Sequence, residues 1–165
     1  MRDIVLIAHD IRSTHNVGSL LRTAEGLGVT TVYFTGYTPY PRKAEDTRLP
    51  YIAEKLTKQI SKTALGAETS QDWEQSEDIH EVLTSLHNNG YTLVGLEQTA
   101  DSIPLHTYKP SNKIALLLGR EVEGIDPSLL ELLDETIEIP MHGKKESFNV
   151  VQAAAMALYH LVWYK

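Results

Sequence analysis

The sequence predicts an open α/β fold, in which a mostly parallel sheet carries helices on both faces. Short apolar runs rich in β-branched residues recur along the chain of 165 residues, and segments with helical spacing of apolar residues lie between them. Tight connections join the first strand, the first helix and the second strand, as in a right-handed βαβ unit. Because this alternation continues to the end of the chain, we expect one α/β domain over residues 1–165.

The first βαβ unit is the clearest part of the pattern. Residues 4–8 form a continuous apolar run that is typical of a buried strand, and a polar loop follows at residues 9–15. Asn16 is a capping residue, so we expect the helix to begin there and to end before Gly28. Its apolar positions recur at spacings of three and four, at Val17, Leu20, Leu21, Ala24 and Leu27. Residues 31–35 are the second predicted strand.

The later elements follow from the same signals. Residues 36–50 contain three prolines, which predicts a long surface loop. In chain order we then expect a short helix over residues 51–60, a helix over residues 76–89 capped by Ser76, a strand over residues 91–96, a strand over residues 114–118, a short helix from Asp126 through Leu133, and a strand over residues 136–139.

The last helix, which runs through Val162, is apolar almost all round, and such a helix is predicted to be buried. Ser147 and Asn149 stand at its start, and either side chain can cap its first turn. The unpaired backbone N–H groups of that turn suit a polar ligand.

Charge is unevenly distributed along the chain, whose net charge is −7. Residues 63–106 hold eight acidic side chains and no Lys or Arg, so the remainder carries 15 basic against 14 acidic residues. Six of these basic residues lie within residues 42–62. The pattern fits either a surface that binds a polyanion or an ordinary solvated face.

Several classes of protein are disfavoured. The chain has no cysteine, which excludes disulfides and thiolate sites, and no apolar run approaches the ~20 residues of a membrane span. The histidines lack paired metal spacing, so we expect no metal site. Ile125 and Asp126 stand where a phosphate-binding loop needs Lys and Ser or Thr, and a hydrolase elbow around Ser147 is missing. A cytoplasmic protein without a signal peptide is expected.

Ligands of open α/β sheets bind beyond the carboxyl ends of the strands. Four predicted loops meet there, at residues 9–16, 97–101, 119–126 and 140–149, and they carry most of the unusual polar residues of the chain. We therefore expect the functional site at this edge.

Three segments of these loops and the adjoining helices carry a family resemblance: Asn16-Val-Gly-Ser-Leu-Leu-Arg22-Thr-Ala, Leu117-Leu-Gly-Arg-Glu121-Val-Glu-Gly124, and Ile139-Pro-Met141 with Ser147-Phe-Asn149. In this order they resemble the three motifs of the SpoU/TrmH family of RNA ribose 2′-O-methyltransferases, within the SPOUT superfamily. Phe148 departs from the usual Leu or Met, and Val151-Gln152 stands where a small Ser is frequent.

The resemblance implies a C-terminal trefoil knot, a homodimer formed through the last helix, and S-adenosylmethionine as cofactor. It also implies a single SPOUT methyltransferase domain without a separate RNA-binding domain. Backbone around the following residues would hold the cofactor: Leu96, Gly119, Ile139, Met141, Ser147 and Phe148.

By the same resemblance Arg22 would be the catalytic residue that acts on the ribose 2′-hydroxyl. A free guanidinium is a poor base, so Arg22 either accepts a proton because burial disfavours its charge, or orients the hydroxyl and stabilises negative charge. Asn16 would position Arg22 or the hydroxyl, and Glu121 would orient the site and the facing subunit. Ser147 and Asn149 would complete it.

The basic segment at residues 42–62, which includes Arg42, Lys43 and Arg48, gives a candidate RNA surface together with Arg12, Lys144 and Lys145. Tyr37, Tyr40 and Tyr51 are available to stack on unpaired bases. We expect tRNA as the substrate, with rRNA as an alternative. Two further hypotheses are a catalytically silent regulator that binds S-adenosylmethionine and RNA, and a nucleotide-binding α/β module unrelated to RNA.

Overall fold

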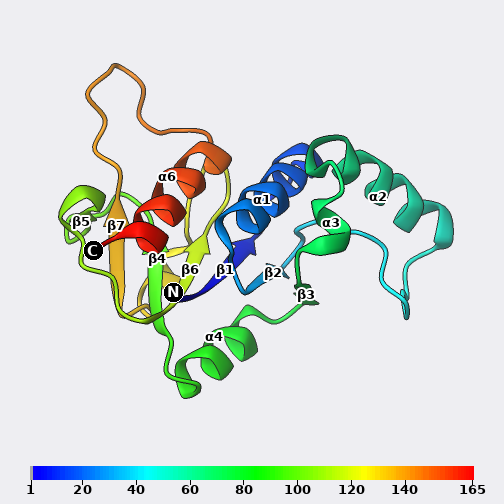
Figure 1. Cartoon of the computed structure of the whole chain (residues 1–165), viewed down its shortest axis with the longest axis horizontal. Coiled ribbons are helices and arrows are strands. Elements are labelled where there is room, and N and C mark those ends of the chain that lie inside the picture. The colour runs from blue at the N-terminus through cyan, green and yellow to red at the C-terminus, as the bar shows by residue number, and fades with distance from the viewer. Residues whose placement is uncertain (1) are drawn as a thin grey trace.

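The computed structural model describes residues 2–165, which form one seven-stranded sheet with every strand parallel to its neighbours (Figure 1). The strand order is β3-β2-β1-β6-β4-β7-β5. The strands are β1 Asp3–His9, β2 Thr31–Thr35, β3 Trp73–Ser76, β4 Thr92–Leu96, β5 Ile103–Pro104, β6 Lys113–Leu118 and β7 Glu135–Glu138. The predicted parallel α/β sheet is thereby confirmed.

Helices cover both faces of the sheet, as predicted. They are α1 Thr14–Leu27, α2 Pro50–Ala64, α3 Ala67–Ser70, α4 Ile79–Asn88, α5 Pro127–Leu130 and α6 Val150–Trp163, with a single 3₁₀ turn at Leu105–Thr107. Alternate residues of β1 point to opposite faces. Leu6 therefore packs with α1 and α6, whereas Ile7 packs with α4 and α5 on the other side.

Helix α1 begins two residues earlier than the sequence predicts. Ser13 is its N-cap, because the Ser13 hydroxyl accepts a hydrogen bond from the Asn16 backbone N–H. Asn16 therefore lies inside the first turn and does not cap it. The predicted end of the helix is confirmed, since Gly28 adopts the left-handed conformation with φ of 70°.

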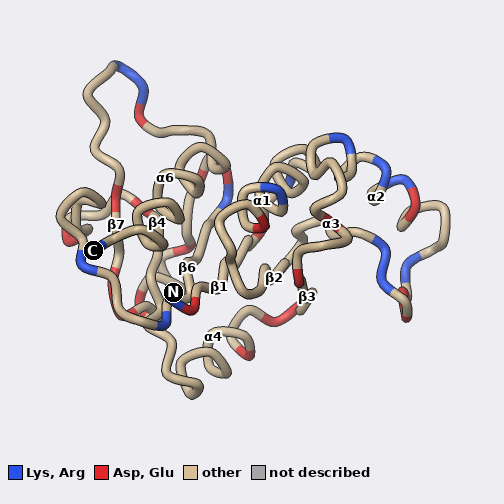
Figure 2. Tube along the Cα trace, in the orientation of Figure 1, with Lys and Arg blue, Asp and Glu red and all other residues tan. Residues whose placement is uncertain are grey.

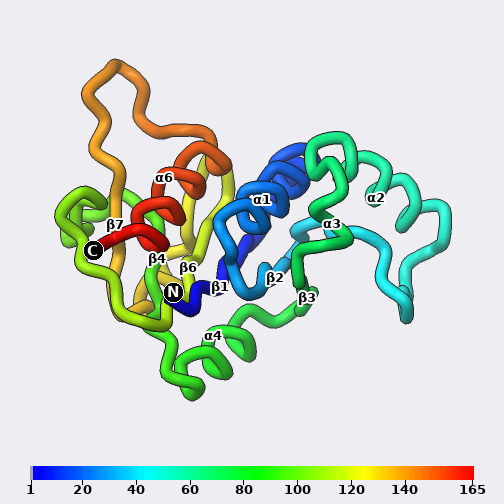
Figure 3. Tube along the Cα trace, in the orientation of Figure 1, coloured from blue at the N-terminus to red at the C-terminus, as the bar shows by residue number. Residues whose placement is uncertain are grey.

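Helix α2 is longer than the predicted helix over residues 51–60, and it lies at the end of the molecule farthest from the C-terminus (Figure 3). Its C-terminal half packs on α1 at Gly18, where a Cβ atom would collide with the Ile60 carbonyl oxygen and the Thr63 hydroxyl. The loop before α2 is irregular, as predicted.

The two edge strands β3 and β5 are absent from the predicted elements. Both are short and only partly buried, so neither has a continuous apolar run. Ser76, predicted as a helix cap, is instead the last residue of β3, and Asp78 caps α4 by accepting a hydrogen bond from the His80 N–H. Helix α5 is shorter than expected because it ends at Leu130.

Helix α6 is not buried on all sides, contrary to the expectation from its composition. Its inner face is buried on the sheet through Ala154, Ala157, Leu158 and Leu161, whereas Tyr159 and Trp163 are each 61% exposed. Asn149 caps the helix as predicted, through a hydrogen bond of 2.9 Å from the Val151 N–H, and Ser147 lies outside the cap. Within residues 2–165, no helix is long and apolar enough to cross a bilayer. The trefoil knot stays a prediction.

Candidate active site

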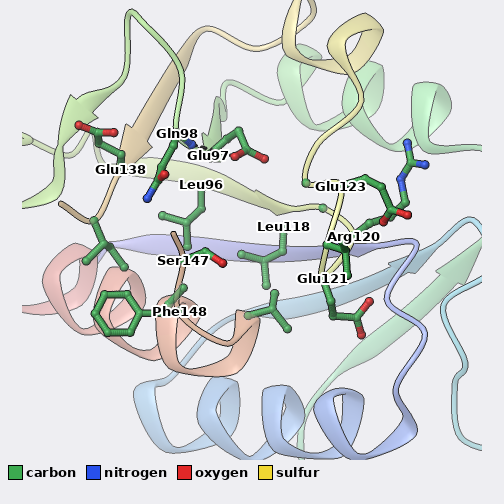
Figure 4. A pocket seen from close by; sticks show the side chains of 16 residues that line it. Leu96, Glu97, Gln98, Leu118, Arg120, Glu121, Glu123, Glu138, Ser147 and Phe148 are labelled. Atoms are coloured by element: carbon green, nitrogen blue, oxygen red, sulfur yellow. Dashed lines mark hydrogen bonds between the residues drawn. The ribbon is translucent and has the colours of Figure 1, made fainter. Parts of the chain in front are cut away.

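A pocket of about 160 Å³ opens beyond the carboxyl ends of β4, β6 and β7, at the edge where the sequence predicts the site. Five of the six predicted cofactor-binding residues line it: Leu96, Gly119, Ile139, Ser147 and Phe148. Leu96, Ser147 and Phe148 lie toward one end of the pocket, and Arg120, Glu121 and Glu123 lie toward the other (Figure 4). Met141, the sixth, lies farther along the exposed loop and does not line the pocket.

The loop after β6 forms the wall of the pocket because two glycines let it close on itself. Backbone hydrogen bonds of 3.1 Å join Arg120 to Gly124 in both directions. A Cβ atom at Gly119 would collide with the Gly124 carbonyl group, so a side chain there would force the loop open. Gly119 is therefore needed for this loop to close.

Glu97 fixes the same loop from the neighbouring strand. Its carboxylate accepts hydrogen bonds of 2.8 Å from the backbone N–H groups of Ile125 and Gln98. Gly124 has a φ of 74° and lies so close to this carboxylate that a Cβ atom would collide with it. The sequence predicted that the loop at residues 97–101 belongs to the site, but it predicted no role for Glu97. The position of Glu97 directly after a strand is the feature that indicates such a role.

Glu121 joins this loop to the start of α1. Its carboxylate accepts hydrogen bonds from the backbone N–H of Arg12 at 3.3 Å, the backbone N–H of Ser13 at 3.2 Å and the side-chain amide of Asn16 at 3.2 Å. Burial alone would raise the pKa of Glu121, but the hydrogen bonds it accepts lower this pKa below its ordinary value. The first two motifs therefore meet through an ionised carboxylate.

The lining of the pocket is acidic on one part and apolar on another. Four carboxylates stand against the single guanidinium of Arg120: Glu97, Glu121, Glu123 and Glu138. The apolar part is made by Leu96, Leu118, Ile139 and Phe148. A ligand that carries positive charge beside an apolar ring system would find complementary groups here. Within residues 2–165, no three His, Asp or Glu side chains are grouped so that they could hold a metal ion.

Arg22 does not line the pocket and is exposed, two helical turns below the start of α1. No ion pair of Arg22 occurs within the described part of the chain. Asn149 likewise lies outside the pocket lining, where it caps α6. Of the predicted catalytic residues, the pocket thus gathers Glu121 and Ser147, with Asn16 held beside Glu121.

Three of the basic residues predicted to bind RNA form contacts within the loop before α2 or with neighbouring elements. Arg48 stacks on Tyr40 with its guanidinium carbon 3.6 Å from the ring centroid, and it pairs with the largely buried carboxylate of Asp46. Arg42 pairs with Glu54 at 3.4 Å, and the Lys43 ammonium donates to the Gln75 side chain at 3.0 Å.

Three other predicted RNA-binding residues are exposed. Arg12 lies 3.6 Å from Glu123 and against the Tyr37 ring. Lys144 and Lys145 stand on the long loop before α6.

Comparison with known proteins agrees with the resemblance seen in the motifs. The model of the SpoU rRNA Methylase family matches residues 3–159. A tRNA (guanosine(18)-2′-O)-methyltransferase of Aquifex aeolicus is 26% identical over 161 residues, which cover 96% of this chain and 68% of that enzyme. The 23S rRNA (guanosine-2′-O-)-methyltransferase RlmB of Acinetobacter baylyi is 28% identical over 157 residues, covering 94% and 58%.

Solved structures share the fold. The A. aeolicus TrmH/SpoU tRNA modifying enzyme superposes with a TM-score of 0.79 at 21% identity, covering 98% of this chain and 74% of that one. The SpoU methyltransferase AviRb from Streptomyces viridochromogenes, in complex with the cofactor AdoMet, also gives a TM-score of 0.79, at 23% identity and coverage of 98% and 58%. Because the family model matches almost the whole chain and the three motifs meet at one edge of the sheet, the chain belongs to the SpoU rRNA methylase family.

Proposed function

We propose that the protein methylates a ribose 2′-hydroxyl in RNA with S-adenosylmethionine as cofactor, and that its substrate is tRNA, with rRNA as the alternative. The observation that carries the proposal is the convergence of the loops bearing the second and third motifs on one pocket, with the first motif tied to it through Glu121. Relatives named as methyltransferases of tRNA and of 23S rRNA support the reaction and leave both substrate classes open.

The pocket residues fit this cofactor. When bound, S-adenosylmethionine supplies a methyl group activated by a sulfonium ion. The four carboxylates of the lining would balance the positive charges of the sulfonium and ammonium groups, and the apolar part would contact the adenosine. Backbone at Leu96, Gly119 and Ile139 would hold the cofactor together with Ser147 and Phe148. Met141 would join them if the loop before α6 folds over the pocket.

The remaining chemistry falls to residues of the first and second motifs. Glu121 engages the amide nitrogen of Asn16, which leaves the Asn16 carbonyl oxygen as the group by which Asn16 would position the ribose hydroxyl or Arg22. Arg22 would either take the hydroxyl proton or stabilise the developing oxyanion, while Ser147 and Asn149 complete the site. Most of the acceleration would come from alignment of the reacting atoms, because proximity supplies ~7 to 11 kcal/mol.

We also propose a homodimer formed through the outward face of α6. Met156, Tyr159 and Trp163 recur there at spacings of three and four, and together with Phe148 they leave an apolar surface open. An exposed aromatic stripe of this kind is typical of a protein interface. Sedimentation analysis should find a dimer for the unaltered protein and a folded monomer for Tyr159→Glu combined with Trp163→Glu. A monomer in both cases would contradict this part of the proposal.

Methyl transfer from labelled S-adenosylmethionine tests the function. Purified protein, incubated with unmodified tRNA transcripts or with 23S rRNA, should label the 2′-oxygen of one nucleotide. We expect a reaction without a metal, so the label should persist in EDTA. Arg22→Ala should abolish transfer, whereas Lys109→Ala, which removes an exposed cation with no assigned role in the site, is the control. Transfer that survives Arg22→Ala unchanged would rule out the role of this residue.

A second candidate is a regulator that binds the cofactor and RNA without chemistry. The exposure of Arg22 and its distance from the pocket lining favour it. Binding of S-adenosylmethionine without transfer to either RNA class would support this alternative. In both cases we propose a cytoplasmic location and a single SPOUT methyltransferase domain over residues 1–165.

A further inference from the structure

The outward face of α2 carries a row of lysines. Tyr51, Lys55, Lys58 and Lys62 are spaced by four, three and four residues, which places them on one side of the helix, and all four are exposed. Figure 2 shows this helix as a mainly basic element at the end of the molecule, although the chain as a whole has a net charge of −7. The row is therefore a local positive surface on an acidic protein.

Nothing in the described part of the chain neutralises these lysines. None of the three ammonium groups forms an ion pair within residues 2–165. The single acidic residue of α2 is Glu54, which pairs with Arg42. Like charges at spacings of three and four residues destabilise a helix by a few tenths of a kcal/mol per pair. Lys62 lies in the last turn of α2 and complements the helix dipole, whereas Lys55 and Lys58 have no stabilising contact that would explain their presence.

The row leads toward the candidate active site. Lys62 precedes Thr63, whose hydroxyl donates a hydrogen bond of 2.8 Å to the carbonyl oxygen of His15 in the first turn of α1. The next residue, Asn16, is held by Glu121 at the pocket. An RNA strand that runs along α2 toward the C-terminal end of the helix therefore reaches the first motif.

The loop before α2 is only the first part of the basic segment at residues 42–62 that the sequence suggested as the RNA surface, and it is a weaker candidate than the helix. The cations of this loop already have partners within the protein, because Arg48 pairs with Asp46 and Lys43 donates a hydrogen bond to Gln75. The side chain of Arg48 is only 16% exposed. The free positive charge of this region thus lies on the helix and not on the loop.

We propose that the outward face of α2 is a docking surface for the sugar–phosphate backbone of the RNA substrate, with Tyr51 placed to stack on an unpaired base at its far end. This inference rests on the proposed RNA substrate. The three lysines rise by about 4.5 and 6 Å along the helix axis, which is the scale of one nucleotide step. A protein partner fits less well, because Lys is depleted in protein interfaces.

The experiment compares two triple variants of equal charge change. One is Lys55→Gln, Lys58→Gln, Lys62→Gln. The matched control is Lys109→Gln, Lys113→Gln, Lys165→Gln, which alters three exposed lysines outside α2. Binding of a mixture of fluorescent, unmodified tRNA transcripts is measured by anisotropy between 50 and 200 mM KCl, and thermal melting verifies that both variants are folded.

Each phosphate contact contributes roughly 0.7 to 0.9 to the slope of log affinity against log salt. The slope for the α2 variant should therefore be smaller in magnitude by about 2 to 3 than the slope for the unaltered protein. The ratio of the variant's Kd to the Kd of the unaltered protein should then fall roughly 20- to 40-fold from 50 to 200 mM KCl. The control should keep the full slope. Equal slopes for the two variants, or no RNA binding by the unaltered protein, would overturn the inference.

The outcome is separable from the proposed function. Normal methyl transfer with an unchanged salt slope in the α2 variant would leave the function standing and remove the docking surface. A reduced slope without transfer to any RNA would leave the docking surface standing and remove the enzyme.

Discussion

Replacing Glu121 by Gln tests whether an ionised carboxylate holds the pocket loop to α1. The substitution keeps the shape of the side chain but removes its charge, so three hydrogen bonds lose their charged acceptor. Hydrogen bonds to charged groups contribute about 1.5 to 3 kcal/mol each when well formed. These bonds are 3.2 to 3.3 Å long and partly exposed, which favours a smaller total of about 1 to 2 kcal/mol.

That loss should lower the Tm by roughly 2 to 8 °C in a chain of this size at pH 7, measured by thermal melting. The difference should depend on pH. The pKa of Glu121 is lower in the folded protein than in the unfolded chain, so its contribution is complete above the unfolded value of about 4.3 and is lost as the pH falls through the folded value. The two melting curves should therefore converge between about pH 5 and pH 3.

Glu123→Gln is the matched control, since it removes a carboxylate two residues away in the same loop. Glu123 pairs with Arg12 at 3.6 Å, and both side chains are about half exposed or more, at 48% and 68%. An exposed pair of this kind contributes about 0 to 1 kcal/mol. If Glu121→Gln melts like Glu123→Gln, or if its deficit is the same at pH 7 and pH 4, the carboxylate does not fasten the two motifs together.

Three further predictions concern packing and loop closure. Gly26→Ala should stabilise the protein by about 0.5 to 1 kcal/mol because its Cβ meets open space in a helix, whereas Gly18→Ala should destabilise it in chemical denaturation because α2 must move away. Gly119→Ala should weaken binding of S-adenosylmethionine by about 10-fold or more in calorimetry, while Gly143→Ala, where space is open, leaves it unchanged; equal affinities would contradict the closure argument. Arg48→Ala should lower the free energy of unfolding by about 2 to 4 kcal/mol in thermal melting, because it leaves the largely buried Asp46 carboxylate without its cation. A decrease below about 0.5 kcal/mol would show that the pair does not stabilise the fold.

The sequence predicted the central elements well because their periodicity comes from burial. The run at residues 4–8 lies between two strands, and the apolar spacing of α1 matches its contact with the sheet. Edge strands β3 and β5 lack this signal, since each is half exposed and as short as two to four residues. The cap of α1 was misplaced because Ser13 and Asn16 are equally good capping residues, and only the backbone geometry separates them.

The candidate site was predictable where residues follow parallel strands, since the carboxyl ends of such strands share one edge. Gly119 and Ile139 reached the pocket in this way. Glu97, directly after β4, and Glu138, the last residue of β7, were missed because a single acidic residue at a strand end has no periodic signal. The pairing of Arg48 with Asp46 also escaped prediction, because a contact between residues two apart depends on the turn that the loop adopts.

The exposure of Arg22 links the proposed dimer to the proposed chemistry. Arg22 is exposed in a single chain, where it could orient the ribose hydroxyl. A role as base requires burial, which a second subunit would supply. If Arg22 is the base, the monomeric variant Tyr159→Glu, Trp163→Glu should lose methyl transfer by more than about 100-fold, the scale of general-base catalysis, even with saturating cofactor and RNA. If the folded monomer transfers at the full rate, Arg22 acts as an orienting cation and the dimer serves another purpose.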